Sequence, residues 1–276
     1  MRVTLAAAGL LTLVSLDAGP MIHAGSPQPP IERVLFIGNS LTYANNLPAM
    51  IEAVAAQSGL GNRLTCRVTA LPDFSLEDHW KDGRAVRAIQ DGHWTTIVLQ
   101  QGPSSLPESE VVLRDYTKRF AAEARRRGAR IALFGVWPSK ARAASFDAVT
   151  TSYAHAAGDV QGLLVAVGEG WRAAWRLDPS LPLYGPDGFH PSPMGTYLGA
   201  LMFFERLTGR SPIGLPGPDS SKGRALRAVR VEAAQLAILQ QAAAEANARS
   251  AADQQVGGRG ATAAPHAHLR YPPPGW

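Results

Sequence analysis

Short runs of apolar residues alternate with longer amphipathic stretches along most of this chain. Five runs predict buried strands, at Val34–Ile37, Leu64–Ala70, Thr95–Gln100, Ile131–Val136 and Leu163–Val167. The stretches between them predict helices, at Pro48–Gln57, Leu76–Ile89, Glu108–Arg127 and Ser145–Ala157. Apolar strands that alternate with helices favour a parallel sheet covered on both faces. With right-handed crossovers, this order predicts an α/β protein: a three-layer α/β/α sandwich around a central, mostly parallel five-stranded sheet.

The start of the chain has a different character. Arg2 precedes the apolar run Val3–Leu16, and small residues follow it. This arrangement predicts a secretory signal peptide over residues 1–24, with cleavage after Ala18 or Ala24. The run is short for a membrane span, which leaves a retained anchor as the alternative. We therefore expect a secreted or periplasmic protein with no stable membrane anchor after cleavage.

One folded domain is predicted over residues 31–215. After a Pro/Gly-rich break, a helix rich in Ala and Gln is expected over residues 224–248, followed by a disordered tail over residues 249–276. The sequence leaves the oligomeric state open, and self-association through this helix is one alternative.

Composition excludes several classes of function. The apolar content is 46%, the charged content 18% and the net charge +5, and the basic residues are scattered. A nucleic-acid-binding face would need clustered cations with interleaved aromatic residues, so we expect no nucleic-acid partner. Cys66 is the single cysteine, which excludes an intramolecular disulfide and a thiolate metal cluster. Its apolar surroundings predict a small buried residue rather than a reactive thiol.

Three residue types that can make a nucleophile of a hydroxyl lie where a parallel sheet would bring them together. Ser40 follows the first predicted strand through Gly38 and Asn39, which suit a tight turn. Asp187 and His190 are three residues apart on a later loop. Active sites of such sheets lie at the carboxyl ends of the strands. The pattern indicates that Asp187 orients His190 and that His190 accepts the proton of Ser40.

These blocks carry a resemblance to a known family. Gly38-Asn39-Ser40-Leu41 and Asp187-Gly188-Phe189-His190 resemble the first and last blocks of the SGNH (GDSL-type) hydrolases, and the likeness covers roughly residues 31–208. It implies an SGNH/flavodoxin-like fold, with Ser40 as the nucleophile, His190 as the base and Asp187 as the third member of a triad. The Gly-x-Ser-x-Gly elbow of the rival α/β-hydrolases is absent around Ser40.

The middle blocks depart from the family pattern. The family takes oxyanion donors from a glycine N–H after the second strand and from an asparagine side chain after the third. Here Asp73 stands near the first place, and Gln100-Gln101-Gly102 replaces the second. The resemblance therefore implies an oxyanion hole built from the backbone N–H groups of Ser40 and Asp73 and the amide of Gln101.

The resemblance implies an exported serine esterase that hydrolyses short-chain esters, above all acetyl esters on carbohydrate, through an acyl-enzyme and without a cofactor or metal. Two alternatives stay open: an O-acyltransferase with the same triad, and a non-catalytic carbohydrate-binding protein. Leu76–Trp80 suggests the capped first turn of a helix rather than a metal site. Trp137, at a strand end, is a candidate platform for a sugar.

Overall fold

The computed structural model describes residues 31–218 and 224–260. The predicted signal peptide (1–24) and the end of the predicted tail (261–276) lie outside these residues. The strands are β1 Glu32–Gly38, β2 Leu64–Ala70, β3 Thr96–Leu99, β4 Arg130–Gly135 and β5 Leu163–Ala166. They form one sheet in the order β2-β1-β3-β4-β5, with every neighbouring pair parallel. The predicted α/β/α sandwich with its five-stranded sheet is confirmed.

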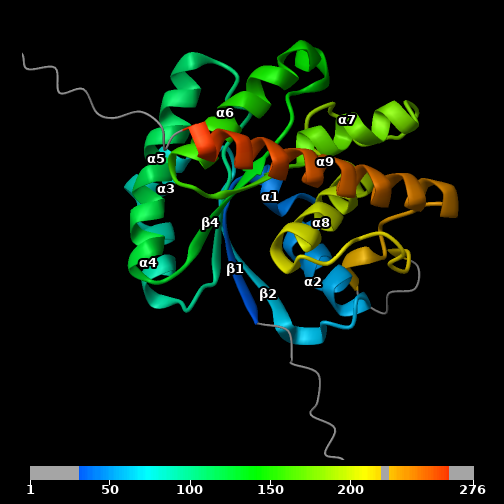
Figure 1. Ribbon diagram of the computed structural model, residues 1–276, viewed down its shortest axis with the longest axis horizontal. Coiled ribbons are helices and arrows are strands. Elements are labelled where there is room, and N and C mark those ends of the chain that lie inside the picture. Colours follow the sequence, from blue (N-terminus) through cyan, green and yellow to red (C-terminus); the bar gives the residue numbers. More distant parts are fainter. Residues whose placement is uncertain (1–30, 219–223, 261–276) are drawn as a thin grey trace, which may run out of the picture.

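Helices cover both faces of the sheet (Figure 1). The α-helices are α1 Ser40–Tyr43, α2 Leu47–Gln57, α3 Leu76–Asp82, α4 Arg84–Asp91, α5 Pro107–Arg126, α6 Phe146–Asp159, α7 Val167–Leu177, α8 Pro193–Thr208 and α9 Ala233–Gly260. Short 3-10 turns are η1 Ala44–Asn46, η2 Gly61–Arg63, η3 Lys140–Ser145 and η5 Arg224–Leu226. Helices α3 to α6 pack in one layer, while α2, α8 and α9 form the other. In the part of the chain that the structure describes, no helix is long and apolar enough to cross a membrane.

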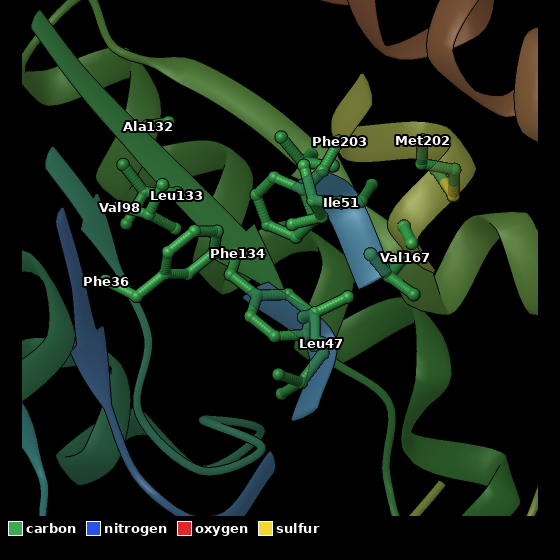
Figure 2. Packing of buried hydrophobic residues seen from close by; sticks show 14 of the residues in the cluster. Phe36, Leu47, Ile51, Val98, Ala132, Leu133, Phe134, Val167, Met202 and Phe203 are labelled. Atoms are coloured by element: carbon green, nitrogen blue, oxygen red, sulfur yellow. The ribbon is translucent and has the colours of Figure 1, made fainter. Parts of the chain in front are cut away.

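The core fills the space on both faces of the sheet, under α5 and α6 on one side and under α2 and α8 on the other. Val34–Ile37 of β1 is buried on both faces of the sheet. Phe203 of α8 packs edge-on against Phe36 and Phe134, with ring centroids 5.3 and 5.1 Å apart (Figure 2). These contacts join β1, β4 and α8. Helix α8 therefore packs against β1, the strand that leads to Ser40, and fixes its position in the core.

Two predicted helices have different bounds in the structure. The helix expected over Leu76–Ile89 is divided into α3 and α4 at Gly83, whose φ of 79° is a left-handed conformation that favours glycine. The helix expected over 224–248 begins at Ala233 and continues to Gly260. Leu226 and Val229 are buried ahead of it, so the segment before α9 packs against the domain through the short 3-10 turn η5 and the irregular residues after it.

Helix α9 belongs to the folded unit rather than to a separate segment. Its residues Leu239, Ala242 and Ala243 are fully buried, and the helix packs on α7, α8 and β5. The folded unit therefore extends past residue 215, and one face of α9 is buried against this chain's own helices.

Candidate active site

Ser40 lies at the point where the order of the strands reverses. The strand that follows β2 in sequence, β3, pairs on the other side of β1, so the segments leaving β1 and β3 diverge at this edge. Open α/β sheets bind their ligands in the crevice at such a switch point. Ser40 follows β1 directly, and Gln100 follows β3. Because β1 and β3 are neighbouring parallel strands, Ser40 and Gln100 lie at the same edge of the sheet, on either side of the point where the two segments separate.

The turn that presents Ser40 is built by its own residues. Asn39 caps α1 by accepting a hydrogen bond from the Leu41 N–H at 3.2 Å, and Ser40 is the first residue of that helix. A Cβ atom on Gly38 would lie 2.4 Å from both the Oε1 of Gln100 and the Oγ1 of Thr42. Glycine is therefore required at this position because two side chains approach its backbone closely.

Ser40, His190 and Asp187 form one hydrogen-bonded chain. The Nε2 atom of His190 lies 2.9 Å from the Ser40 Oγ, and the Nδ1 atom lies 2.6 Å from the Oδ2 of Asp187. Because the carboxylate can only accept, the ring hydrogen is on Nδ1, and Nε2 is free to accept the serine proton. The structure thus brings the three predicted residues together in the predicted order.

The Asp187 carboxylate is fixed by its own loop. Its Oδ1 accepts hydrogen bonds from the backbone N–H groups of Phe189 at 3.0 Å and His190 at 2.9 Å. The hydrogen bond from the His190 side chain, followed by the one from Phe189, lowers the pKa of Asp187 to about 2. Asp187 is therefore ionised at neutral pH, as a group that supports an imidazolium must be.

The loop that carries His190 is anchored from both sides. The Trp137 Nε1–H donates to the Phe189 carbonyl at 2.9 Å, and the Lys140 N–H donates to the Gly188 carbonyl at 2.8 Å. Trp137 itself is buried and stacks on Trp171, with centroids 3.8 Å apart. The hypothesis that Trp137 forms an exposed sugar platform is wrong, because this ring supports the histidine loop from within the core.

A contact that sequence reasoning missed joins the two halves of the site. Asn45, in η1 just after the Ser40 helix, donates from Nδ2 to the Pro191 carbonyl at 2.8 Å and to the Thr196 Oγ1 at 2.9 Å. Its φ of 50° is left-handed, a conformation that asparagine tolerates better than most residues. The Asn45-Asn46 pair is the only sequence signal, and it indicates a turn rather than a long-range contact.

The two glutamines after β3 have different partners from those expected. Gln100 is fully buried. Its Oε1 accepts hydrogen bonds from the Asn39 N–H at 2.9 Å and from the Thr42 hydroxyl at 2.7 Å. Its Nε2 donates to the Asn39 Oδ1 at 2.8 Å. Gln101 donates from Nε2 to the Ser104 Oγ and the Ser109 carbonyl, at 2.8 and 3.1 Å.

The predicted oxyanion role of the Gln101 amide does not fit this geometry. Its amide nitrogen donates to Ser104 in the loop before α5 and to the Ser109 carbonyl in the first turn of α5, and its Oε1 accepts from the Leu76 N–H at 3.2 Å. Gln101 therefore holds the start of α3, and the structure does not bring its amide to Ser40. The physical reason is that the side chain is turned into the core, where only 4% of it is exposed.

Asp73 lies on a loop that is bonded to the nucleophile turn. The Leu71 N–H donates to the Gly38 carbonyl at 3.2 Å, and the Asn39 Nδ2 donates to the Phe74 carbonyl at 3.1 Å. Asp73 has a φ of 58°, the left-handed conformation that a glycine would adopt without strain. Among the described residues its N–H has no hydrogen-bond partner. The oxyanion hole formed by the backbone N–H groups of Asp73 and Ser40 thus stays a prediction, which this geometry allows.

The site is exposed to solvent at the acid–histidine loop and closely packed at the residues next to Ser40 and after β3. The side chains of His190 and Asp187 are 40% and 51% exposed, whereas Leu41, Thr42 and Gln100 are buried. A group bonded to Ser40 would thus have closely packed, buried residues on the side of Leu41, Thr42 and Gln100. On the side of the acid–histidine loop it would face solvent.

Two further predictions concern residues outside the triad. Ser75 caps α3 as expected, in a reciprocal capping box with Asp78. Cys66 is buried, and burial raises the pKa of its thiol well above the usual value, which confirms a packed rather than a reactive cysteine. The part of the chain that the structure describes has no group of three or more metal-ligating side chains.

The fold defines the class of this protein as an α/β/α sandwich of the SGNH hydrolase type. A protein from Slackia heliotrinireducens that is described as a putative SGNH hydrolase matches with 26% identity and a TM-score of 0.54, over 64% of this chain and 98% of its own. A DUF4886 family protein from Bacteroides uniformis matches with 19% identity and a TM-score of 0.63, over 78% and 94% of the two chains.

A lipase/acylhydrolase from Enterococcus faecalis shares the fold with 13% identity and a TM-score of 0.52, over 65% of this chain and 97% of its own. No protein-family model matches the sequence, and no curated protein is significantly similar to it. The resemblance to SGNH hydrolases that two short blocks predict is nevertheless confirmed by the solved structures, whose fold this chain shares.

Proposed function

We propose that this protein is an exported serine esterase that hydrolyses short-chain esters, above all acetyl esters on carbohydrate. The observation that carries the proposal is the continuous hydrogen-bonded chain from the Ser40 hydroxyl through His190 to Asp187. The fold shared with SGNH hydrolases supports ester hydrolysis as the reaction. The close packing behind Ser40 suits a small acyl group, and the exposed acid–histidine loop suits a bulky alcohol such as a sugar.

The geometry accounts for an acyl-enzyme mechanism. The Ser40 Oγ bonds to the ester carbonyl carbon while its proton passes to the Nε2 of His190. Asp187 stabilises the resulting imidazolium. The backbone N–H groups of Ser40 and Asp73 donate hydrogen bonds to the carbonyl oxygen, which carries the negative charge. His190 then protonates the departing alcohol as the C–O bond breaks. In the second half, His190 takes a proton from water as the water oxygen attacks the acyl carbon. His190 then returns this proton to the Ser40 Oγ as the bond between that oxygen and the acyl carbon breaks, which releases the acid and restores Ser40.

The first experiment compares p-nitrophenyl acetate and butyrate hydrolysis by the wild-type chain and by Ser40→Ala. Removal of the nucleophile should lower kcat by about 10⁴-fold or more, and acetate should be preferred over butyrate. A variant as active as wild type would exclude Ser40 as the nucleophile.

Two outcomes separate the alternatives. Product analysis with added sugar acceptors distinguishes hydrolysis from acyl transfer, because the exposed site admits either water or an alcohol. A folded wild-type protein that neither hydrolyses the esters nor reacts with a serine-directed fluorophosphonate would instead be a carbohydrate-binding protein without catalysis. Export is tested separately, by sequencing the N-terminus of the protein recovered from outside the cytoplasm.

A further inference from the structure

His79 is a buried histidine that the proposed mechanism does not use. It lies in α3 and is fully buried, and its Nε2 atom is 2.7 Å from the Gly38 carbonyl oxygen. Because a carbonyl oxygen only accepts, the ring hydrogen must be on Nε2. The Nδ1 atom then carries a lone pair, and it has no hydrogen-bond partner among the described residues.

The carbonyl that His79 binds belongs to the last residue before the nucleophile turn. Gly38 ends β1, and the next two residues are the helix cap Asn39 and the nucleophile Ser40. The same carbonyl accepts a second hydrogen bond from the Leu71 N–H at 3.2 Å. The hydrogen bond from His79 therefore helps to fix the peptide between Gly38 and Asn39, which leads into the turn that presents Ser40.

His79 also contacts the loop that carries Asp73. Its ring packs edge-on against Phe74, with centroids 5.1 Å apart, and the Phe74 carbonyl accepts the side-chain amide of Asn39. One imidazole thus touches both the backbone before Ser40 and the loop with the second predicted oxyanion donor.

The position of His79 is itself determined by the start of its helix. Ser75 and Asp78 form the capping box that begins α3, and the Oε1 of Gln101 accepts the N–H of Leu76. Burial lowers the pKa of His79, so the ring is neutral at neutral pH, as its single donated hydrogen bond requires.

We propose that His79 is a positioning residue that holds the nucleophile turn and the 71–75 loop in one fixed arrangement, and so sets the placement of Ser40 and the Asp73 N–H. The inference rests on the proposed function of Ser40. It gives a role to a histidine that the sequence pattern indicated only as part of a capped helical turn.

Three variants test the proposal. His79→Phe keeps an aromatic ring beside Phe74 but removes the donor to Gly38, and it should lower kcat about 10-fold or more with KM changed less than about 2-fold. His79→Gln places an amide nitrogen near the position of Nε2 and should recover most of the lost kcat. Trp80→Leu is the matched control, since Trp80 lies on the same helix but packs on Phe120 of α5, and its kcat should stay within about 2-fold of wild type.

Amide hydrogen exchange provides a readout that needs no substrate. In His79→Phe, exchange should rise in peptides that cover residues 36–43 and 71–76, whereas Trp80→Leu should leave these peptides protected. Equal kcat and equal exchange in the His79→Phe and Trp80→Leu proteins would overturn the proposal while the esterase function stands. A wild-type protein without ester hydrolysis or fluorophosphonate labelling would instead overturn the proposed function, and the exchange data would still decide whether His79 holds the turn.

Discussion

At the scale of single residues, Asp73 is the clearest departure from an optimal site. It holds a left-handed backbone conformation that costs a non-glycine residue about 1 kcal/mol, and it adds a carboxylate to the loop beside the nucleophile turn. Asp73→Gly should therefore raise kcat about 2- to 10-fold, because both the backbone strain and the negative charge on the loop beside the nucleophile turn are removed. Asp73→Asn, which removes only the charge, separates the two effects. A decrease in kcat in both variants would show that the carboxylate itself takes part in binding.

Asp187 gives a prediction with a pH dependence. Its pKa in the folded chain is about 2, below the usual 3.8, so its contribution to folding is complete above about pH 4 and is lost as the pH falls through 2. Asp187→Asn should lower kcat about 10⁴-fold, because an amide neither holds the ring hydrogen of His190 on Nδ1 nor stabilises the imidazolium. The difference in denaturation midpoint between variant and wild type should shrink between pH 4 and pH 2. A difference that grows on acidification would contradict the assigned direction of the pKa.

At the scale of elements, the link between the Ser40 segment and the His190 loop is the Asn45 amide. Asn45→Gly keeps the left-handed backbone but removes the hydrogen bonds to Pro191 and Thr196, which contribute about 1 kcal/mol each. It should lower kcat about 10-fold and reduce the melting temperature by several degrees. Asn46→Gly is a matched control, since Asn46 has a φ of 58° and caps no helix with its side chain. Similar kinetics in the two variants would show that Asn45 does not set the distance between Ser40 and His190.

The parts of the fold and site that follow from short-range patterns were predictable. The strands have a clear apolar signature, and the rule that parallel strands end at one edge placed Ser40 beside the acid–histidine loop. The roles of Asn45 and Gln100 were not predictable, because an amide side chain has no periodic signature and its partners lie far away in sequence. Gln101 was misassigned for the same reason: whether an amide faces the site or the core depends on a rotamer that the sequence does not specify.

At the scale of the whole molecule, the sheet has two edge strands, and α9 closes the one formed by β5. Gln254 of α9 donates to the Gly162 carbonyl at 2.7 Å and accepts the Leu164 N–H at 3.4 Å, so one side chain pairs with the exposed edge. Covering an edge in this way prevents pairing with another chain. The helix is therefore a structural part of the folded domain of this chain, although the sequence suggests a separate segment.

This role predicts a sharp difference between two alanines of α9. Ala243 is fully buried against the domain, whereas Ala248 is exposed. Ala243→Asp buries a carboxylate without a partner, at a cost of about 3 to 5 kcal/mol, and should lower the melting temperature by roughly 10 °C and promote aggregation in light scattering. Ala248→Asp, five residues further along α9 and on its exposed side, should change neither the melting temperature nor the light scattering. Because α9 contributes no residue to the triad, kcat per folded Ala243→Asp molecule should equal that of wild type. Equal melting temperatures for the two variants would mean that α9 detaches without loss to the fold.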